Sequence, residues 1–164
     1  MKLESLKDLY LEQLKDLYSA ETQLLDALPK LADGASAPDL KQAFSEHLRQ
    51  TQEHVRRLER IFDTLGESPK GHTCEGMKGL VREGEQMLQM KGEPAVLDAG
   101  LIAAAQRVEH YEIAGYGTVR TYAELLGHDD QVALLERTLD EEEQTDELLT
   151  RLAESHVNEE AFSS

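Results

Sequence analysis

The strongest constraint on the fold is a spacing of three and four residues between apolar side chains, kept over long segments of the chain. Such spacing gathers apolar side chains on one helix face, so it predicts long helices over residues 3–32, 37–65, 95–126 and 129–156 and a shorter one over 77–90. No segment alternates polar and apolar residues for long enough to predict a strand. The sequence therefore predicts an all-α protein.

The lengths of the links predict how these helices are connected. Only a few residues join the first long helix to the second and the third to the fourth, so each pair is expected to form an antiparallel hairpin. Residues 66–93 join the second to the third and can travel the length of a bundle, carrying the short helix on the way. The expected fold is a ferritin-like four-helix bundle with one long crossover, formed by residues 1–164 as a single domain.

Two local features bear on where the helices end. Pro29 is expected to kink or terminate the first helix, because proline has no N–H to donate. The tail over 157–164 follows the last apolar repeat, and we expect it to fray.

Composition narrows the classes of function. The chain carries 17 Lys and Arg against 33 Asp and Glu, a net charge of −16 at pH 7. This balance argues against binding to nucleic acid or anionic membranes, since both require basic side chains. Cys74 is the only cysteine, so no intramolecular disulfide and no cysteine-based zinc site can form, and a reducing cytoplasm is the expected location. The sequence shows no apolar run of the kind found in signal peptides or transmembrane helices.

Polar side chains interrupt the apolar face of each long helix near its middle. The interruptions are Glu21 on the first helix, His47, Thr51 and His54 on the second, Glu109 and Glu112 on the third, and Glu142 and Asp146 on the fourth. A buried face is expected to be apolar, so these positions require an explanation.

The predicted hairpins place these polar residues at one height in the bundle. A turn between the first two helices puts Glu21 opposite position 48, next to His47. A turn between the last two puts Glu109 opposite Asp146. His47 and Glu109 also lie at nearly the same distance from the ends of two helices that we expect to run parallel. All four helices would therefore contribute to one polar layer.

Such a layer needs positive charge, because buried like charges cannot all stay ionised without it. No Lys or Arg is expected at this height on the helix faces that meet. Two divalent metal ions would supply the charge and accept carboxylate and imidazole ligands together, which suits iron, or manganese, better than metals that prefer thiolates. The candidate ligands are Glu21, His47, His54, Glu109, Glu112, Glu142 and Asp146.

Four segments, which together span nearly the whole chain, form a recognisable pattern. They are Tyr18-Ser-Ala-Glu21; Phe44 with His47-Leu48 and Thr51; the run from Ala103 to Ala114 with Tyr116-Gly117; and Glu141-Glu142 with Thr145-Asp146. This pattern resembles that of the YciF-type (YciE/YciF) ferritin-like stress proteins. The third segment, which contains Glu109-His110-Tyr111-Glu112, is long and specific.

The resemblance implies a ferritin-like four-helix fold, a rubrerythrin-like di-metal centre and a homodimer. In it, Glu109 and Glu112 look like the carboxylate pair on the third helix of rubrerythrin. The second helix departs from the family pattern, since many relatives carry Glu where this chain has Gln50, and Gln where it has His54. One bridging carboxylate is therefore missing from the expected set.

Simpler interpretations of the same residues stay open. A histidine on a buried helix face, such as His47 or His54, is more often a hydrogen-bonded core residue than a ligand. Glu109 and Glu112 can belong to a solvated face, and Glu142 lies in a run of three glutamates that can be exposed.

Two functions are compatible with the sequence. The first is a stress-response di-iron oxidoreductase or peroxidase that reacts with peroxide or dioxygen. The second is a non-catalytic stress or interaction protein with a structural or vestigial metal site. Iron storage in a multi-subunit shell is a weaker third, because nothing in the sequence indicates shell contacts.

Overall fold

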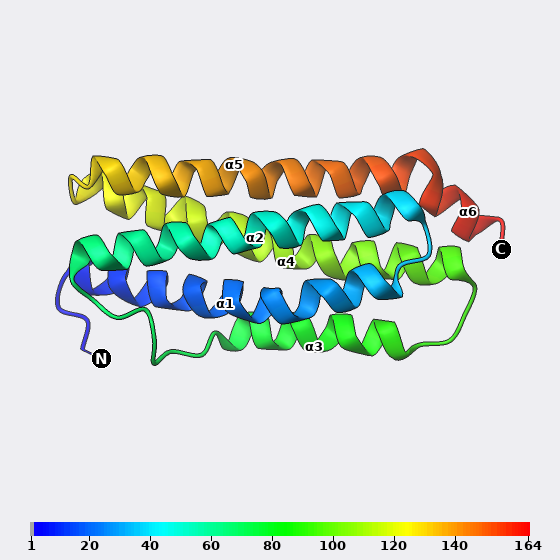
Figure 1. The fold of residues 1–164 in the computed structure, drawn as a ribbon, viewed down its shortest axis with the longest axis horizontal. Coiled ribbons are helices and arrows are strands. Elements are labelled where there is room, and N and C mark those ends of the chain that lie inside the picture. Colours follow the sequence, from blue (N-terminus) through cyan, green and yellow to red (C-terminus); the bar gives the residue numbers. More distant parts are fainter. Residues whose placement is uncertain (1) are drawn as a thin grey trace.

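The computed structural model describes residues 2–164 and arranges four long helices side by side (Figure 1). Short turns join α1 to α2 and α4 to α5, and the crossover runs outside the bundle, so that α2 and α4 are parallel. No strand occurs within these residues. The predicted all-α, ferritin-like four-helix bundle with a long crossover is confirmed. Its helices are α1 (Leu6–Gly34), α2 (Pro38–Leu65), α3 (Glu75–Gln89) in the crossover, α4 (Pro94–Leu125) and α5 (Asp129–Leu152).

Local chemistry accounts for most of the helix ends. Ser5 caps α1, since its hydroxyl accepts the Asp8 N–H at 3.2 Å. Pro38 and Pro94 open α2 and α4, where a missing N–H costs nothing. Gly66 ends α2 with a φ of 68°, a left-handed conformation that glycine adopts without strain.

Pro29 lies inside α1, which continues past it to Gly34, slightly beyond the predicted end. Leu28 and Leu31 lie on either side of the proline and are 2% and 7% exposed. Burial of these two leucines stabilises the last turns of the helix, although proline cannot donate a backbone hydrogen bond there.

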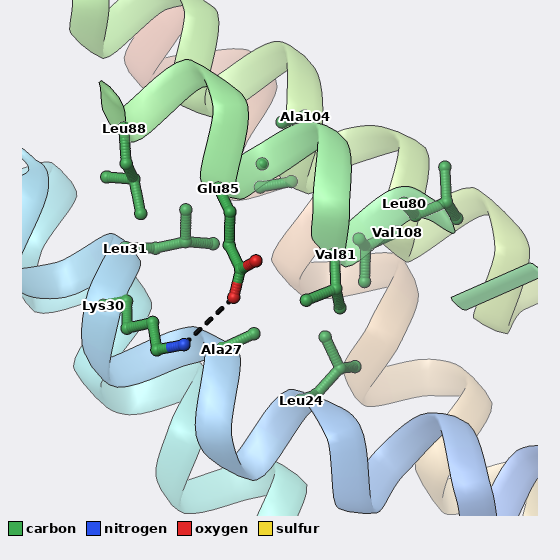
Figure 2. A pocket seen from close by; sticks show the side chains of 12 residues that line it. Leu24, Ala27, Lys30, Leu31, Leu80, Val81, Glu85, Leu88, Ala104 and Val108 are labelled. Carbon is green, nitrogen blue, oxygen red and sulfur yellow. Dashed lines mark hydrogen bonds and ion pairs between the residues drawn. The ribbon is translucent and has the colours of Figure 1, made fainter. Parts of the chain in front are cut away.

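Helix α3 covers the side of the bundle formed by α1 and α4. A small apolar space separates the three helices, with Leu31, Leu88 and Val108 among its walls (Figure 2). The ion pair between Lys30 Nζ and Glu85 Oε1, 3.0 Å apart, crosses it (Figure 2). The volume of this apolar space is only about 20 Å³, room for about one water molecule. Helix α3 therefore seals the bundle here and leaves no ligand pocket.

The C-terminal segment is helical, which corrects the prediction that residues 157–164 fray. A π-helical turn, η1 (Ala153–Val157), follows α5 and leads into α6 (Asn158–Phe162). Val157 is 1% exposed, and the Nε2 of His156 lies 2.6 Å from Asp39 Oδ2 at the start of α2. The buried valine and this ion pair anchor the segment to the bundle.

Two apolar cores fill the bundle, one on each side of a buried polar layer. The first core draws on residues 20–35, 40–44 and 101–108, and the second on residues 10–17, 58–62 and 116–123. The polar interruptions on α2 and α4 lie between these segments, and Glu21 lies beside Ala20 at the start of the first core segment of α1. Among residues 2–164, no helix has the length and apolar character needed to cross a membrane.

Candidate metal centre

Four side chains from four helices meet in the polar layer and form what we term the four-residue group. One oxygen or nitrogen of each lies within 4.8 Å of the others, and all four residues are fully buried. The Nδ1 atom of His54 is 2.9 Å from Glu142 Oε1 and 3.3 Å from Glu21 Oε1. The group consists of Glu21 of α1, His54 of α2, Glu112 of α4 and Glu142 of α5.

A second cluster, the three-residue group, lies beside the first and shares Glu142 with it. It consists of His47, Glu109 and Glu142. The Nε2 atom of His47 is 2.8 Å from Glu109 Oε1 and 3.9 Å from Glu142 Oε2. Glu142 directs Oε1 to one group and Oε2 to the other, so a cation in either group would find one of its oxygens.

The layer contains buried polar atoms that have no hydrogen-bond partner among the described residues. Short distances join some of these atoms, but without the orientation of a hydrogen bond. Each such atom costs about 1–3 kcal/mol when buried unsatisfied. The eight atoms are Glu21 Oε2, His47 Nε2, His54 Nδ1, Glu109 Oε2, and both carboxylate oxygens of Glu112 and Glu142.

Burial has a strong effect on two of the carboxyl groups. It raises the pKa of Glu109 well above its ordinary value, and the neighbouring Glu142 and Glu21 raise it further. Burial and the same two neighbours also raise the pKa of Glu112. Both shifts favour the protonated form of these two carboxyl groups when no cation is bound.

The pKa shifts of Glu142 and His54 favour their charged forms. Burial alone would raise the pKa of Glu142, but contact with Glu109, His47 and His54 holds it below its ordinary value. Burial opposes a charge on His54, yet the surrounding carboxylates, Glu21 foremost, raise the pKa of His54 to about 12. A protonated histidine is thus the positive charge that partly neutralises the metal-free layer.

Two divalent cations fit these residues. The donors are oxygens and imidazole nitrogens from separate helices, a set that suits iron or manganese. The unpartnered atoms lie where cations would satisfy them, and cations bound there would compete with protons for the same oxygen and nitrogen atoms.

Partners outside the layer hold two of the candidate ligands in place. The Tyr116 hydroxyl donates to Glu21 Oε1 at 2.7 Å. The Nε2 atom of His54 is 3.1 Å from Glu141 Oε2, and Arg57 donates to both oxygens of Glu141 at 3.0 and 2.8 Å. A carboxylate on the outer nitrogen of a ligating histidine orients the ring and raises its basicity.

Sequence analysis missed Arg57 and Glu141. Arg57 is 8% exposed, so the expectation that no basic residue lies at this height overlooked it. Both residues sit beside the interrupted faces rather than on them: Arg57 is one turn after His54, and Glu141 directly precedes Glu142. The three-residue spacing from His54 to Arg57, about one helical turn, is the sequence feature that could have indicated Arg57.

Asp146 is the one predicted ligand that the structure does not bring into either group. Its Oδ2 is 3.2 Å from His110 Nε2, and its Oδ1 accepts from Gln106 Nε2 at 3.3 Å. Asp146 lies one turn after Glu142 on α5. Its side chain points toward the outer side of α4 and is 19% exposed. Gln50 is likewise outside both groups and accepts from the Thr145 hydroxyl at 3.2 Å.

Comparison with known proteins gives consistent results. The family described as "Domain of unknown function (DUF892)" matches residues 5–162. The chain is 43% identical to Protein YciF of Escherichia coli (strain K12) over 162 residues, 98% of either chain.

Solved structures agree with this relationship. The crystal structure of the E. coli stress protein YciF matches with a TM-score of 0.92, at 43% identity, over 95% of this chain and 99% of that one. YcfI of Rhodopseudomonas palustris matches with a TM-score of 0.87, at 42% identity, over 91% and 95%. Ferritin-like, diiron-carboxylate proteins of Bacillus anthracis share the fold, with a TM-score of 0.70, at 20% identity, over 92% and 99%. The chain belongs to the DUF892 family, together with the YciF stress protein.

Proposed function

We propose that this protein binds two divalent ions, iron in the first place, in its buried polar layer and reacts with peroxide or dioxygen in a stress response. The observation that carries the proposal is the set of eight buried, unpartnered polar atoms around the shared Glu142. Leaving so many atoms unsatisfied would destabilise the bundle, whereas cations would satisfy them.

Each side chain has a defined part in this function. Glu142 would bridge the two ions, Glu21, Glu112 and His54 would complete one position, and Glu109 and His47 the other. Irons bound there would supply electrons by cycling between the ferrous and ferric states. Tyr116 holds one oxygen of Glu21, which leaves the other oxygen for a cation. The apolar cores on both sides exclude bulk water from the layer.

Elemental analysis of iron-loaded protein tests the proposal. We expect two irons per chain in the natural protein and about one in Glu109→Ala, which removes a ligand of the three-residue group only. Glu143→Ala is the matched control, because Glu143 is exposed next to Glu142 and should leave both irons bound. Loss of iron in neither variant, or in both equally, would contradict the assignment. Peroxide consumption, followed with the near-ultraviolet absorption of the loaded protein, then tests turnover.

A second function is favoured by how tightly the layer is enclosed. His47 is the most exposed of the six clustered residues, at only 3%. A sealed metal site of this kind suits a structural role in a non-catalytic stress protein. Iron that raises the melting temperature without any consumption of peroxide or dioxygen would support this function over the first.

We also propose that the protein acts as a homodimer in the cytoplasm, following the resemblance of the chain to its family. Multi-angle light scattering of the full chain measures the first part. A mass of two chains is the expected result, and a single chain or a large shell would contradict it.

A further inference from the structure

The surface seam between α2 and α5 contains a groove with an unusual concentration of arginine. The two helices lie side by side along their length (Figure 1). The groove has a volume of about 390 Å³, and five of its nine lining residues are arginines. The whole chain has only nine arginines and a net charge of −16. The five are Arg49, Arg56, Arg57, Arg60 and Arg137.

Their carboxylate partners do not balance these charges. Arg49 pairs with Glu46 and Arg56 with Glu53, each three residues away on the exposed side of α2. Such exposed pairs contribute little, because water and salt screen them. They therefore leave both guanidinium groups available to another anion.

Two of the remaining three arginines share a single carboxylate. Arg57 donates to both oxygens of Glu141, and Arg137 Nε lies 3.6 Å from the same group. Arg60 has no acidic partner within 4.0 Å among residues 2–164. Together, five guanidinium groups face three carboxylates, so the groove keeps an excess of positive charge.

The extent of this charge indicates what kind of anion it would accept. The groove continues past Arg60 and Arg137 to Asp130, where an acidic side chain closes the positive run. Beyond about 8 Å, salt screens exposed charges at physiological ionic strength, so the acidic remainder of the surface does not cancel the groove locally. A long polyanion would nevertheless leave the groove and meet that acidic surface.

We propose that the α2–α5 groove binds a compact oxyanion of the phosphate type, either free phosphate or the phosphoryl group of a small molecule, held by Arg60 and Arg137. The planar fork of guanidinium matches phosphate oxygens in pairs, which lysine cannot do. Both arginines are exposed and can turn toward a ligand without disturbing the core. Glu141 links the groove to His54, but Arg60 and Arg137 contact none of the six clustered residues, so phosphate binding can be tested separately from the proposed function.

Calorimetric titration of the metal-free full chain with inorganic phosphate tests the proposal. The double variant Arg60→Gln/Arg137→Gln should bind phosphate at least about tenfold more weakly, because it removes both guanidinium groups that hold the anion. Arg82→Gln/Arg107→Gln is the matched control, since it changes the net charge equally at two exposed arginines outside the groove. We expect the control to bind phosphate within about twofold of the natural chain.

Other probes distinguish the source of the phosphate. Glucose 6-phosphate binding tighter than inorganic phosphate would assign a phosphorylated small molecule, and equal or weaker binding would assign the free ion. Four results would overturn the proposal. They are no saturable binding up to about 10 mM, equal weakening in both double variants, tighter binding of a short DNA duplex through the same arginines, and a groove variant whose mass by light scattering falls from dimer to monomer.

Discussion

The four-residue group and the three-residue group share Glu142, yet the chain supports their ligands differently. In the four-residue group, Tyr116 donates to Glu21, and Glu141 contacts the outer nitrogen of His54. These partners fix the orientation of two candidate ligands in the absence of a cation. Four donors, two of them held in place, make this position the more pre-organised of the two.

The three-residue group has less support and lies nearer to solvent. The outer nitrogen of His47, Nδ1, has the Thr145 hydroxyl at 3.5 Å, at the limit of a hydrogen bond. His47 and Thr145 also line a hollow of about 330 Å³ on the α2–α5 seam. The comparison shows that one layer combines a well-supported set of donors with a less supported set beside a surface hollow. We therefore expect the four-residue group to hold the tighter ion and the three-residue group the looser one.

The largest effect should come from removing the residue that the two groups share. We expect Glu142→Ala to lower the affinity for both ions by more than a hundredfold. This loss exceeds the roughly 10–100-fold that is typical when a residue that hydrogen-bonds to a metal ligand is changed. Metal titration followed by equilibrium dialysis measures both affinities. Glu143→Ala provides the control at the adjacent exposed position. Retention of one tight ion in Glu142→Ala would show that Glu142 does not bridge.

Metal removal should lower the melting temperature, and we expect the size of this loss to differ between variants of the two groups. An ion at about a hundred times its Kd stabilises a fold by about 2.7 kcal/mol, which for a chain of this length raises the melting temperature by about 5–10 °C. We expect Glu112→Ala to lose more of this gain than Glu109→Ala, because Glu112 belongs to the tighter group. Calorimetry of each variant with and without iron isolates the gain from changes in the metal-free fold. Equal losses would mean that the positions do not differ.

A smaller effect should follow from changing Glu141, which acts through His54. Glu141→Gln keeps an oxygen near His54 Nε2 but removes the charge, and we expect the tighter ion to bind about 10–100-fold more weakly. The looser ion should be unaffected, because His47 has no contact with Glu141. Asp140→Asn is a control on the same helix at an exposed position. Equal weakening at both positions would indicate general destabilisation instead.

The fold was predictable because the information that specifies it is local. Apolar spacing marks a helix face regardless of what lies opposite, and link lengths decide which helices form hairpins. The same logic placed Glu21 near the height of His47, since a tight turn fixes the register of two antiparallel helices. Pro29 shows the limit of local reasoning, because buried neighbours keep α1 helical beyond it.

Parts of the site depend on rotations that the sequence does not contain. Asp146 and Glu142 are one turn apart on α5, but only Glu142 faces the centre of the layer, since the orientation of each helix about its axis is set by packing. Glu141 reaches His54 from the flank of its helix, and Arg57 in turn reaches Glu141; a stripe of spaced residues omits such long side chains.

The smallest expected effect concerns Gln50, which stands near His47 as Glu141 stands near His54. Gln50 accepts from the Thr145 hydroxyl, and that hydroxyl also faces the outer nitrogen of His47. A carboxylate at position 50 would accept more strongly from the Thr145 hydroxyl and make its oxygen a better acceptor for an N–H at His47 Nδ1. The three-residue group would then gain a partner that orients His47, as Glu141 orients His54. We expect Gln50→Glu to tighten the looser ion by up to about tenfold, the lower end of outer-partner effects, and to leave the tighter ion unchanged. Equilibrium dialysis compares the two affinities directly, with Gln144→Glu as a control that adds the same charge at an exposed position on α5. If Gln50→Glu and Gln144→Glu tighten the looser ion equally, the added negative charge alone accounts for the effect. The hydrogen bonding of His47 would then not explain why the two positions differ.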